Sequence, residues 1–133
     1  MNPVLLSFNL ERGIIICNAV LINGSFTMIA SRVAIDCCAS YTILAPWLVK
    51  GLNIPVDNSN IAEIDGLTGS IYLPKVVVPQ IGILGANARN VDVLVGKLPV
   101  KIGLDGVLGY SFLKHFKIIT INYEKQELTL FSE

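Results

Sequence analysis

The candidate catalytic group of this chain is the carboxylate of Asp36. It follows the apolar run Val-Ala-Ile at 33–35 and precedes Cys37, Cys38 and Ala39. A carboxylate between apolar residues tends to be buried or half-buried, where it must be paired, hydrogen-bonded or protonated. Such an environment is typical of a group that exchanges protons in catalysis. We therefore predict that Asp36 is catalytic, and the alternative is a structural aspartate that caps a turn.

The other acidic side chains are expected to belong to the surface and to turns. Those predicted to be solvated are Asp57, Glu63, Asp92, Glu124 and Glu127. Asp105 precedes the segment Gly106-Val107-Leu108-Gly109 and could serve as a second catalytic carboxylate. The residues after Asp105 do not repeat those after Asp36, so we interpret Asp105 as a turn residue.

Three cysteines and one histidine offer a different chemistry, that of a thiolate nucleophile or a metal site. Cys37 and Cys38 are adjacent, and Cys17 makes the count odd, so a disulfide framework is not expected. A Cys–His pair with His115 is a minor alternative, and a zinc site would lack the Cys-x-x-Cys spacing. We expect no metal or other cofactor. Free thiols are typical of a reducing compartment, which predicts a cytoplasmic protein.

Short strands are expected to position these residues, because isoleucine and valine fall in short runs broken by Gly, Asn, Asp and Pro. The strongest hairpin signal is Asn23-Gly24, which joins residues 13–21 to residues 26–35. Further strands are predicted at 61–64, 70–73, 75–83, 88–95, 118–123 and 127–131. Short helices are predicted at 46–50 and 111–116, the second with Ser111 as its cap. The pattern predicts one compact, mostly-β domain of barrel type.

Size and composition narrow the classes of function. The chain has 133 residues with ten basic and ten acidic side chains, so it lacks the basic surplus typical of nucleic-acid-binding proteins. Hydrophobic residues make up 53% and charged residues 15%, which excludes disorder and favours a buried subunit interface. No apolar stretch approaches the roughly 20 residues of a membrane span, and the N-terminus is not typical of a signal peptide. We expect neither nucleic acid nor a membrane as a partner.

Four segments, in order, resemble the retropepsin-like aspartic proteases. Asp36-Cys37-Cys38-Ala39-Ser40 is similar to the Asp-Thr-Gly-Ala-Ser loop of that family. Residues 65–69, Asp-Gly-Leu-Thr-Gly, lie where the family has its flap hairpin. Residues 106–113 resemble the second signature, in which two hydrophobic residues and a glycine precede a short helix. Residues 119–130 resemble the closing hairpin, so the resemblance covers roughly residues 13–131.

The resemblance implies a mostly-β, closed barrel-like retropepsin fold with one or two short helices, residues 1–133 forming a single domain of a two-fold homodimer. A chain with one such loop supplies one carboxylate, whereas the hydrolysis needs two. The implied function is an aspartic endopeptidase in which Asp36 of each subunit activates a water molecule to attack a peptide bond. The implied partners are a second copy of the chain and a peptide or protein substrate.

The same resemblance implies roles for residues near Asp36. The residues implied to bind substrate are Cys38, Ser40, Asp65, Gly66 and Leu67. Cys37 stands where the family has a hydroxyl residue that grips the loop of the partner, and a thiol is the weaker hydrogen-bonding group. Cys38 stands where the family has glycine, so its side chain adds volume at the scissile bond. The alternative is therefore a catalytically inactive dimeric module that binds peptides or only oligomerises.

Overall fold

The protein is described by a computed structural model that covers residues 2–66 and 69–132. Strands dominate this part of the chain, and short helices accompany them, as the sequence predicts. In order, the elements are β1 Asn2–Ser7, β2 Asn9–Glu11, β3 Ile14–Asn23, β4 Phe26–Ile35, β5 Thr42–Leu44, α1 Pro46–Gly51, β6 Ile61–Gly66, β7 Gly69–Ile83, β8 Ala86–Val95, β9 Gly106–Leu108, α2 Tyr110–Leu113, β10 Ile118–Asn122 and β11 Glu127–Ser132.

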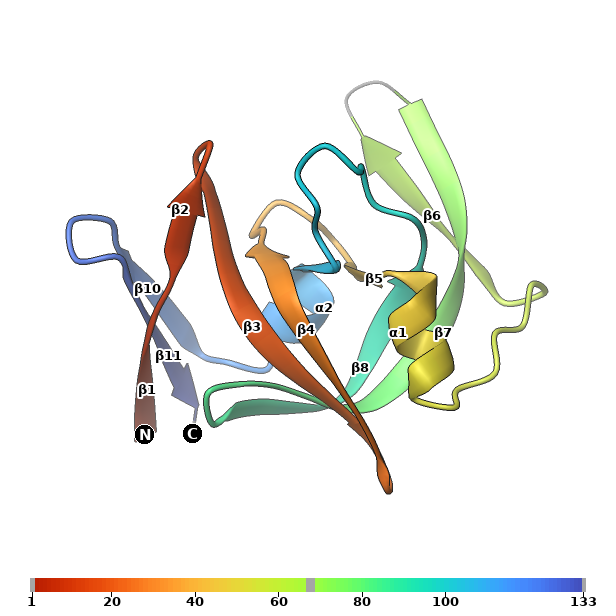
Figure 1. Cartoon of the computed structure of the whole chain (residues 1–133), viewed down its shortest axis with the longest axis horizontal. Helices are drawn as coiled ribbons and strands as arrows, with labels where there is room; N and C mark the ends of the chain where they lie inside the picture. The colour runs from red at the N-terminus through yellow and green to blue at the C-terminus, as the bar shows by residue number, and fades with distance from the viewer. Residues whose placement is uncertain (1, 67–68, 133) are drawn as a thin grey trace.

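Six of the strands close into a barrel. Neighbouring strands pair in the order β3, β4, β9, β5, β8 and β7, and β7 pairs in turn with β3. The closing register places Leu21 opposite Ile81, and both side chains are buried. β2 and β6 extend the sheet beyond the barrel (Figure 1). The predicted mostly-β barrel is therefore confirmed.

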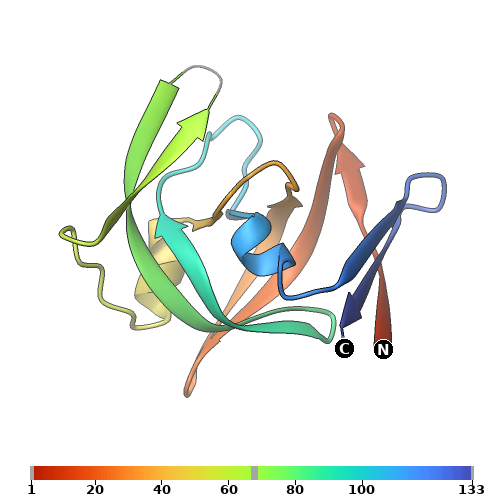
Figure 2. The same ribbon diagram turned by 180° about the vertical axis from the view of Figure 1, so that it is seen from behind.

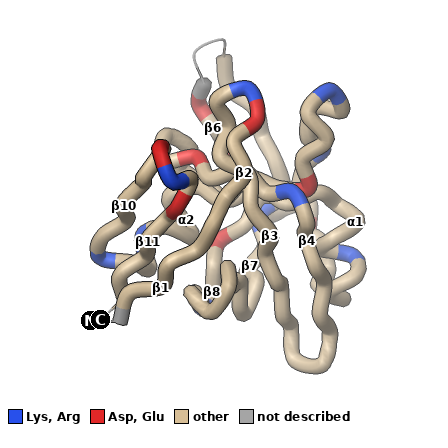
Figure 3. The backbone as a smooth tube through the Cα atoms, turned by 60° about the vertical axis from the view of Figure 1, so that its left-hand side comes forward, with Lys and Arg blue, Asp and Glu red and all other residues tan. Residues whose placement is uncertain are grey.

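Alternating side chains give the barrel an apolar interior. In β8, Ala88, Val91 and Val93 are buried, whereas Asn87 and Arg89 are exposed. Strands with this pattern bury one face, and each Å² of apolar surface removed from water stabilises the fold by about 25 cal/mol. The charged segments are scattered mainly over loops and strand ends (Figure 3). The barrel is therefore held by apolar packing.

A second, three-stranded sheet contains both ends of the described chain. β11 lies in its centre, with β1 on one side and β10 on the other, and both pairings are antiparallel. Leu6, Leu128 and Leu130 are buried and join the core cluster of the barrel. Figures 1 and 2 show the two ends side by side, with α2 between this terminal sheet and the barrel strands.

The sequence patterns did not predict the shortest strands, and they predicted the N-cap of the second helix at the wrong residue. β2, β5 and β9 have three residues each, too few to show a periodicity, and β1 lies in a segment where no strand was expected. α2 begins at Tyr110, and the residue that precedes it is Gly109. Ser111 therefore lies inside the helix and does not cap it. In the described residues, no helix is both long enough and apolar enough to cross a membrane.

We predict that the ionisation of Cys17 limits stability at alkaline pH. Cys17 lies on β3 and is buried, and this burial raises the pKa of its thiol from 9.0 to about 12. Above pH 9 the thiolate therefore forms only in the unfolded chain, which binds fewer protons than the folded one. The free energy of unfolding should fall by about 1.4 kcal/mol per pH unit between roughly pH 9 and 12.

Urea titrations at a series of alkaline pH values test this prediction, with Cys17→Val as the control. The variant lacks the thiol and should show a shallower decline than the wild type. Parallel curves for the two proteins would show that the Cys17 thiol ionises equally well in the folded state.

Candidate active site

The loop that contains Asp36 crosses over the end of a strand. β9 lies between β4 and β5, parallel to β4 and antiparallel to β5. The chain leaves β4 at Ile35 and enters β5 at Thr42, so residues 36–41 must pass across the C-terminal end of β9. Ile35 and Leu108 are register partners at this end. The crossing brings Asp36 against a segment more than seventy residues away in the sequence.

Gly109 makes the crossing possible. A Cβ atom on this residue would lie 2.7 Å from the carbonyl oxygen of Ala39 and still closer to that of Tyr41. Backbone atoms cannot move aside as a flexible side chain can. A glycine is therefore required here because of close backbone approach.

Hydrogen bonds lock the loop onto β9 and α2. The Asp36 amide donates to the carbonyl of Leu108 at 3.0 Å, and the Tyr110 amide donates to that of Ala39 at 2.7 Å. These two bonds fix both sides of the loop.

Two buried hydroxyl groups form further hydrogen bonds that hold the Asp36 loop in place. Ser111 Oγ accepts the Thr42 amide at 2.8 Å and donates to the carbonyl of Asp92 at 2.7 Å. Thr42 Oγ1 accepts the Gly109 amide at 3.2 Å. Both side chains are buried, so each bond also avoids the cost of an unpaired polar group. Ser111 was predicted only as a helix cap and Thr42 was given no role, although a threonine within an apolar run was a usable signal.

Asp36 itself is exposed, which corrects the prediction that it is buried or half-buried. The reason is that Asp36 begins the loop that leaves β4, where none of the described residues covers its side chain. Its Oδ1 accepts the Cys38 amide at 2.9 Å, and within the described residues Oδ2 has no hydrogen-bond partner. One oxygen therefore orients the carboxylate while the other is open to water or to another group.

Asp36 lies at a cavity of about 400 Å³. Its lining comes from the turn after β2, the ends of β3 and β4, the segment that leads into β9, and the β10 region. The lining side chains are mainly apolar and include Ile14, Ala34, Leu104 and Val107. The cavity therefore places a carboxylate oxygen beside space suited to an apolar side chain.

Cys37 and Cys38 are both free and exposed. Cys37 borders the Asp36 cavity and also a second hollow, which is lined in part by Tyr110, Leu113 and Ile119. Cys38 is not among the described residues with positive φ, so its side chain causes no backbone strain where the family has glycine. Ser40 is exposed on the same loop.

The predicted flap is the hairpin of β6 and β7. Asp65 pairs with Ser70, and Gly66 with Gly69, whereas Leu67 lies outside the described residues. The Ser70 hydroxyl donates to Asp65 at 2.5 Å, and Tyr72 donates to Glu63 at 2.6 Å. These pairs share one polar face of the hairpin.

The opposite face of the hairpin is apolar. Ile64 pairs with Ile71, and Ala62 with Leu73. Leu73 lies directly over Gly96 at the end of β8. The apolar face is therefore turned toward the body of the domain, and the Asp65 carboxylate lies on the other side.

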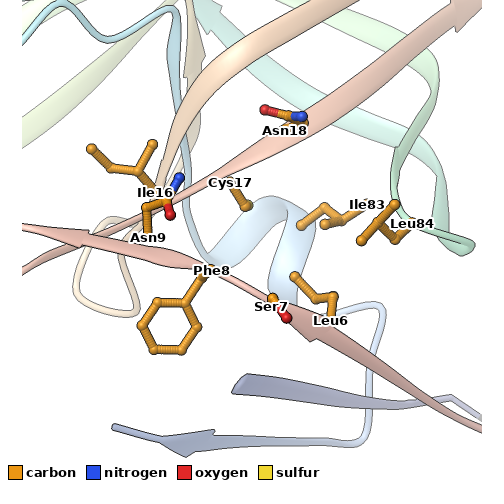
Figure 4. A pocket seen from close by; sticks show the side chains of 9 residues that line it. All are labelled: Leu6, Ser7, Phe8, Asn9, Ile16, Cys17, Asn18, Ile83 and Leu84. Atoms are coloured by element: carbon orange, nitrogen blue, oxygen red, sulfur yellow. The ribbon is translucent and has the colours of Figure 1, made fainter. Parts of the chain in front are cut away.

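Within the described residues, no hydrogen bond joins His115 to Cys37 or Cys38, and no group of possible metal ligands is assembled. Cys17 lines a separate pocket with side chains from β1, β2, β3 and the β7–β8 turn (Figure 4), and its raised pKa keeps the thiol neutral near pH 7. His115 is exposed beyond α2. Among the residues that the structure describes, no three His, Cys, Asp or Glu side chains are grouped as metal ligands would be.

The remaining acidic residues divide into surface and anchoring groups. Asp57, Glu63 and Glu124 are exposed as predicted, whereas Asp92 and Glu127 are half-buried. Asp105 is an anchor: its Oδ2 accepts the Arg32 amide at 3.2 Å, and its own amide donates to the Arg32 carbonyl at 2.7 Å.

Comparisons with known proteins agree with this geometry. Residues 19–112 match the family model described as aspartyl protease. No curated protein sequence matches the chain. Among solved structures, a retropepsin-like aspartic protease from Rickettsia conorii aligns with a TM-score of 0.66 and 20% sequence identity, over 97% of this chain and 90% of that one. The fold is therefore retropepsin-like.

We predict that Gly109→Ala displaces the Asp36 loop. The added methyl group meets two carbonyl oxygens, so the variant should lose roughly 1–3 kcal/mol of stability and any activity that depends on Asp36. Gly51→Ala is the matched control, because its methyl group meets only the flexible end of Met28. Urea unfolding and peptidase assays measure both effects. A Gly109→Ala variant with wild-type stability would refute the argument from close approach.

Proposed function

Because the chain belongs to the aspartyl protease family, we propose that it is an endopeptidase whose catalytic groups are two Asp36 carboxylates, one from each copy in a two-fold homodimer. The observation that supports this most directly is the open Oδ2 of Asp36, held beside an apolar cavity on a loop locked at both sides. A single chain offers one such loop, and a second copy would supply the second carboxylate.

The proposed chemistry needs the two carboxylates in different protonation states. One takes a proton from the attacking water, while the other, protonated, polarises the carbonyl of the scissile bond. Two carboxylates about 3 Å apart cannot both ionise, so they share one proton and titrate as a pair. Because each loop is fixed by buried hydroxyl groups, little reorganisation is needed when the pair forms.

The surface next to Asp36 suits a second copy of the chain. Tyr110 is 60% exposed, although it is a large hydrophobic residue. Tyr110 also shares a hollow with Cys37. Covering this surface would bury apolar area and bring the two Asp36 loops together. Cys37 is then the residue that we propose holds the Asp36 loops of the two subunits together.

The proposed substrate is a peptide in extended conformation. Cys38 and Ser40 belong to the loop that would face it, and the cavity lined by Ile14 and Leu104 would take an apolar side chain next to the scissile bond. The β6–β7 hairpin would close over the peptide as a flap. Asp65, Gly66 and Leu67 would contribute through their backbone, because the Asp65 carboxylate already accepts the Ser70 hydroxyl.

We predict that Asp36→Asn abolishes peptide hydrolysis. The amide cannot act as a general base, and an exposed side chain should change without loss of fold. Wild-type activity should peak in acid and fall toward neutral pH, as the shared proton is lost. A peptidase assay at a series of pH values measures the activity of Asp36→Asn and the pH profile of the wild type. Sedimentation should show a species near twice 14.4 kDa, the mass of one chain.

Three outcomes separate the proposal from its rivals. Residual activity in Asp36→Asn would move the chemistry to another group, with Cys37 or Cys38 the first to test. Peptide binding by the wild type without turnover would identify an inactive binding module. A species of single-chain mass at high concentration would exclude the two-carboxylate mechanism.

We predict that Cys37→Thr with Cys38→Gly strengthens the enzyme. Under reducing conditions the threonine hydroxyl should tighten the dimer by about 0.5–1.5 kcal/mol, the net contribution of a hydrogen bond. Removing the Cys38 side chain should raise the rate by clearing volume beside Asp36. The assay compares dimer dissociation and peptide hydrolysis with those of the wild type.

Oxidation provides a second readout of the Cys37 geometry. Across a tight two-fold axis, two Cys37 residues with Cα atoms roughly 4.4–6.8 Å apart could form a disulfide, so oxidant should join the subunits unless Cys37 is replaced. If the double variant loses both affinity and activity, these cysteines are adapted parts of a different site.

A further inference from the structure

Arg32, on β4, joins the end of β2 to the loop between β8 and β9 through its side chain. Its Nη1 and Nη2 donate to the two carboxylate oxygens of Glu11, each at 2.9 Å. Nη2 also donates to the carbonyl of Ile102 at 2.9 Å, and Nε donates to that of Gly103 at 3.1 Å. All three guanidinium nitrogens are therefore engaged, which a lysine could not reproduce.

Both loops are walls of the cavity at Asp36. Glu11 ends β2, and the turn that follows contains Gly13, which lines the cavity. Leu104 follows Gly103 directly and lines the same cavity. The β2–β3 turn and the loop between β8 and β9 project from the same end of the molecule (Figure 1). Arg32 thus joins two walls that are not neighbours in the sequence.

The root of the second wall is anchored independently of the guanidinium. Asp105 is bonded to the backbone of Arg32 in both directions, at 3.2 and 2.7 Å. Replacing the Arg32 side chain would therefore release Ile102 and Gly103 while Asp105 stays in place. The loop of Asp36 is also independent, since Thr42 and Ser111 hold it.

The ion pair of Arg32 and Glu11 is suited to an active site that functions at acidic pH. Hydrogen bonds from Arg32 lower the pKa of the Glu11 carboxyl, so Glu11 stays charged to lower pH than an isolated glutamate. Both side chains are open to solvent, with 35% of the Arg32 and 44% of the Glu11 side chain exposed. The contact between Arg32 and Glu11 would therefore persist at the acidic pH at which the proposed pair of Asp36 carboxylates is active.

We propose that Arg32 is a positioning residue that sets the width of the Asp36 cavity, and hence the enzyme's affinity for a peptide with a bulky apolar residue beside the scissile bond. This inference rests on the proposed peptidase function. Arg32 touches no reacting atom. Without its side chain the walls separate and the apolar side chain of the peptide loses contact, whereas Asp36 keeps its orientation.

The experiment compares Arg32→Met, Arg32→Lys and Glu11→Gln with a control, Arg89→Met, which changes an exposed arginine on β8 that is not part of the cavity lining. We expect Arg32→Met to raise KM for such a peptide by roughly tenfold with kcat changed by less than about twofold. Arg32→Lys should recover part of this loss, and Glu11→Gln, which leaves the bonds to Ile102 and Gly103, should lose less. Arg89→Met should behave as the wild type.

Amide hydrogen exchange tests the contact without reference to activity. Arg32→Met should speed exchange in residues 11–14 and 101–104 together, and leave residues 36–42 unchanged. Faster exchange in one wall alone, or lower thermal stability with an unchanged KM, would overturn the proposal. If the wild type cleaves no peptide, the proposed function fails, and the affinity for the same peptide by calorimetry then replaces KM.

Discussion

The structure depends on one crossing, where the loop after β4 passes over the end of β9. Gly109 allows the backbones to approach, and the bonds of Thr42 and Ser111 hold them there. These bonds are buried, so breaking one leaves an unpaired polar group at a cost of about 1–3 kcal/mol. The carboxylate of Asp36 needs only one bond of its own, to Cys38, because the backbone beneath it is already fixed.

The barrel provides the rigid frame for this crossing. Pairing of β3 with β7 closes the sheet, and it places β4, β9 and β5 side by side. The parts that would contact a substrate lie outside this frame: the β2–β3 turn, the loop after β8 and the β6–β7 hairpin. Arg32, in β4, donates to Glu11 at the start of the first of these and to the Ile102 carbonyl in the second, so a residue of the barrel joins two parts that are far apart in the sequence.

The parts of the fold that follow from local sequence could be predicted, and those that depend on distant partners could not. Asn23-Gly24 specified the β3–β4 hairpin, and the segment from Asp36 to Ser40 identified the loop by its resemblance. The bond from Thr42 to Ser111 joins residues 69 apart, and no local pattern specifies such a partner. The exposure of Asp36 was also missed, because apolar neighbours in sequence describe the adjoining strand and not the loop that leaves it.

The terminal sheet has a consequence for how the chain assembles. Each copy has its own β1 and β10 on the two sides of β11, so the protomer completes this sheet without borrowing a strand. Folding and association are then separate equilibria, so a protomer can stay folded below the dissociation constant of the proposed dimer, and the midpoint of unfolding rises with protein concentration only above it. If the proposed homodimer is the active form, dilution would abolish activity while every protomer stays folded, and a higher local concentration of the protein would restore it.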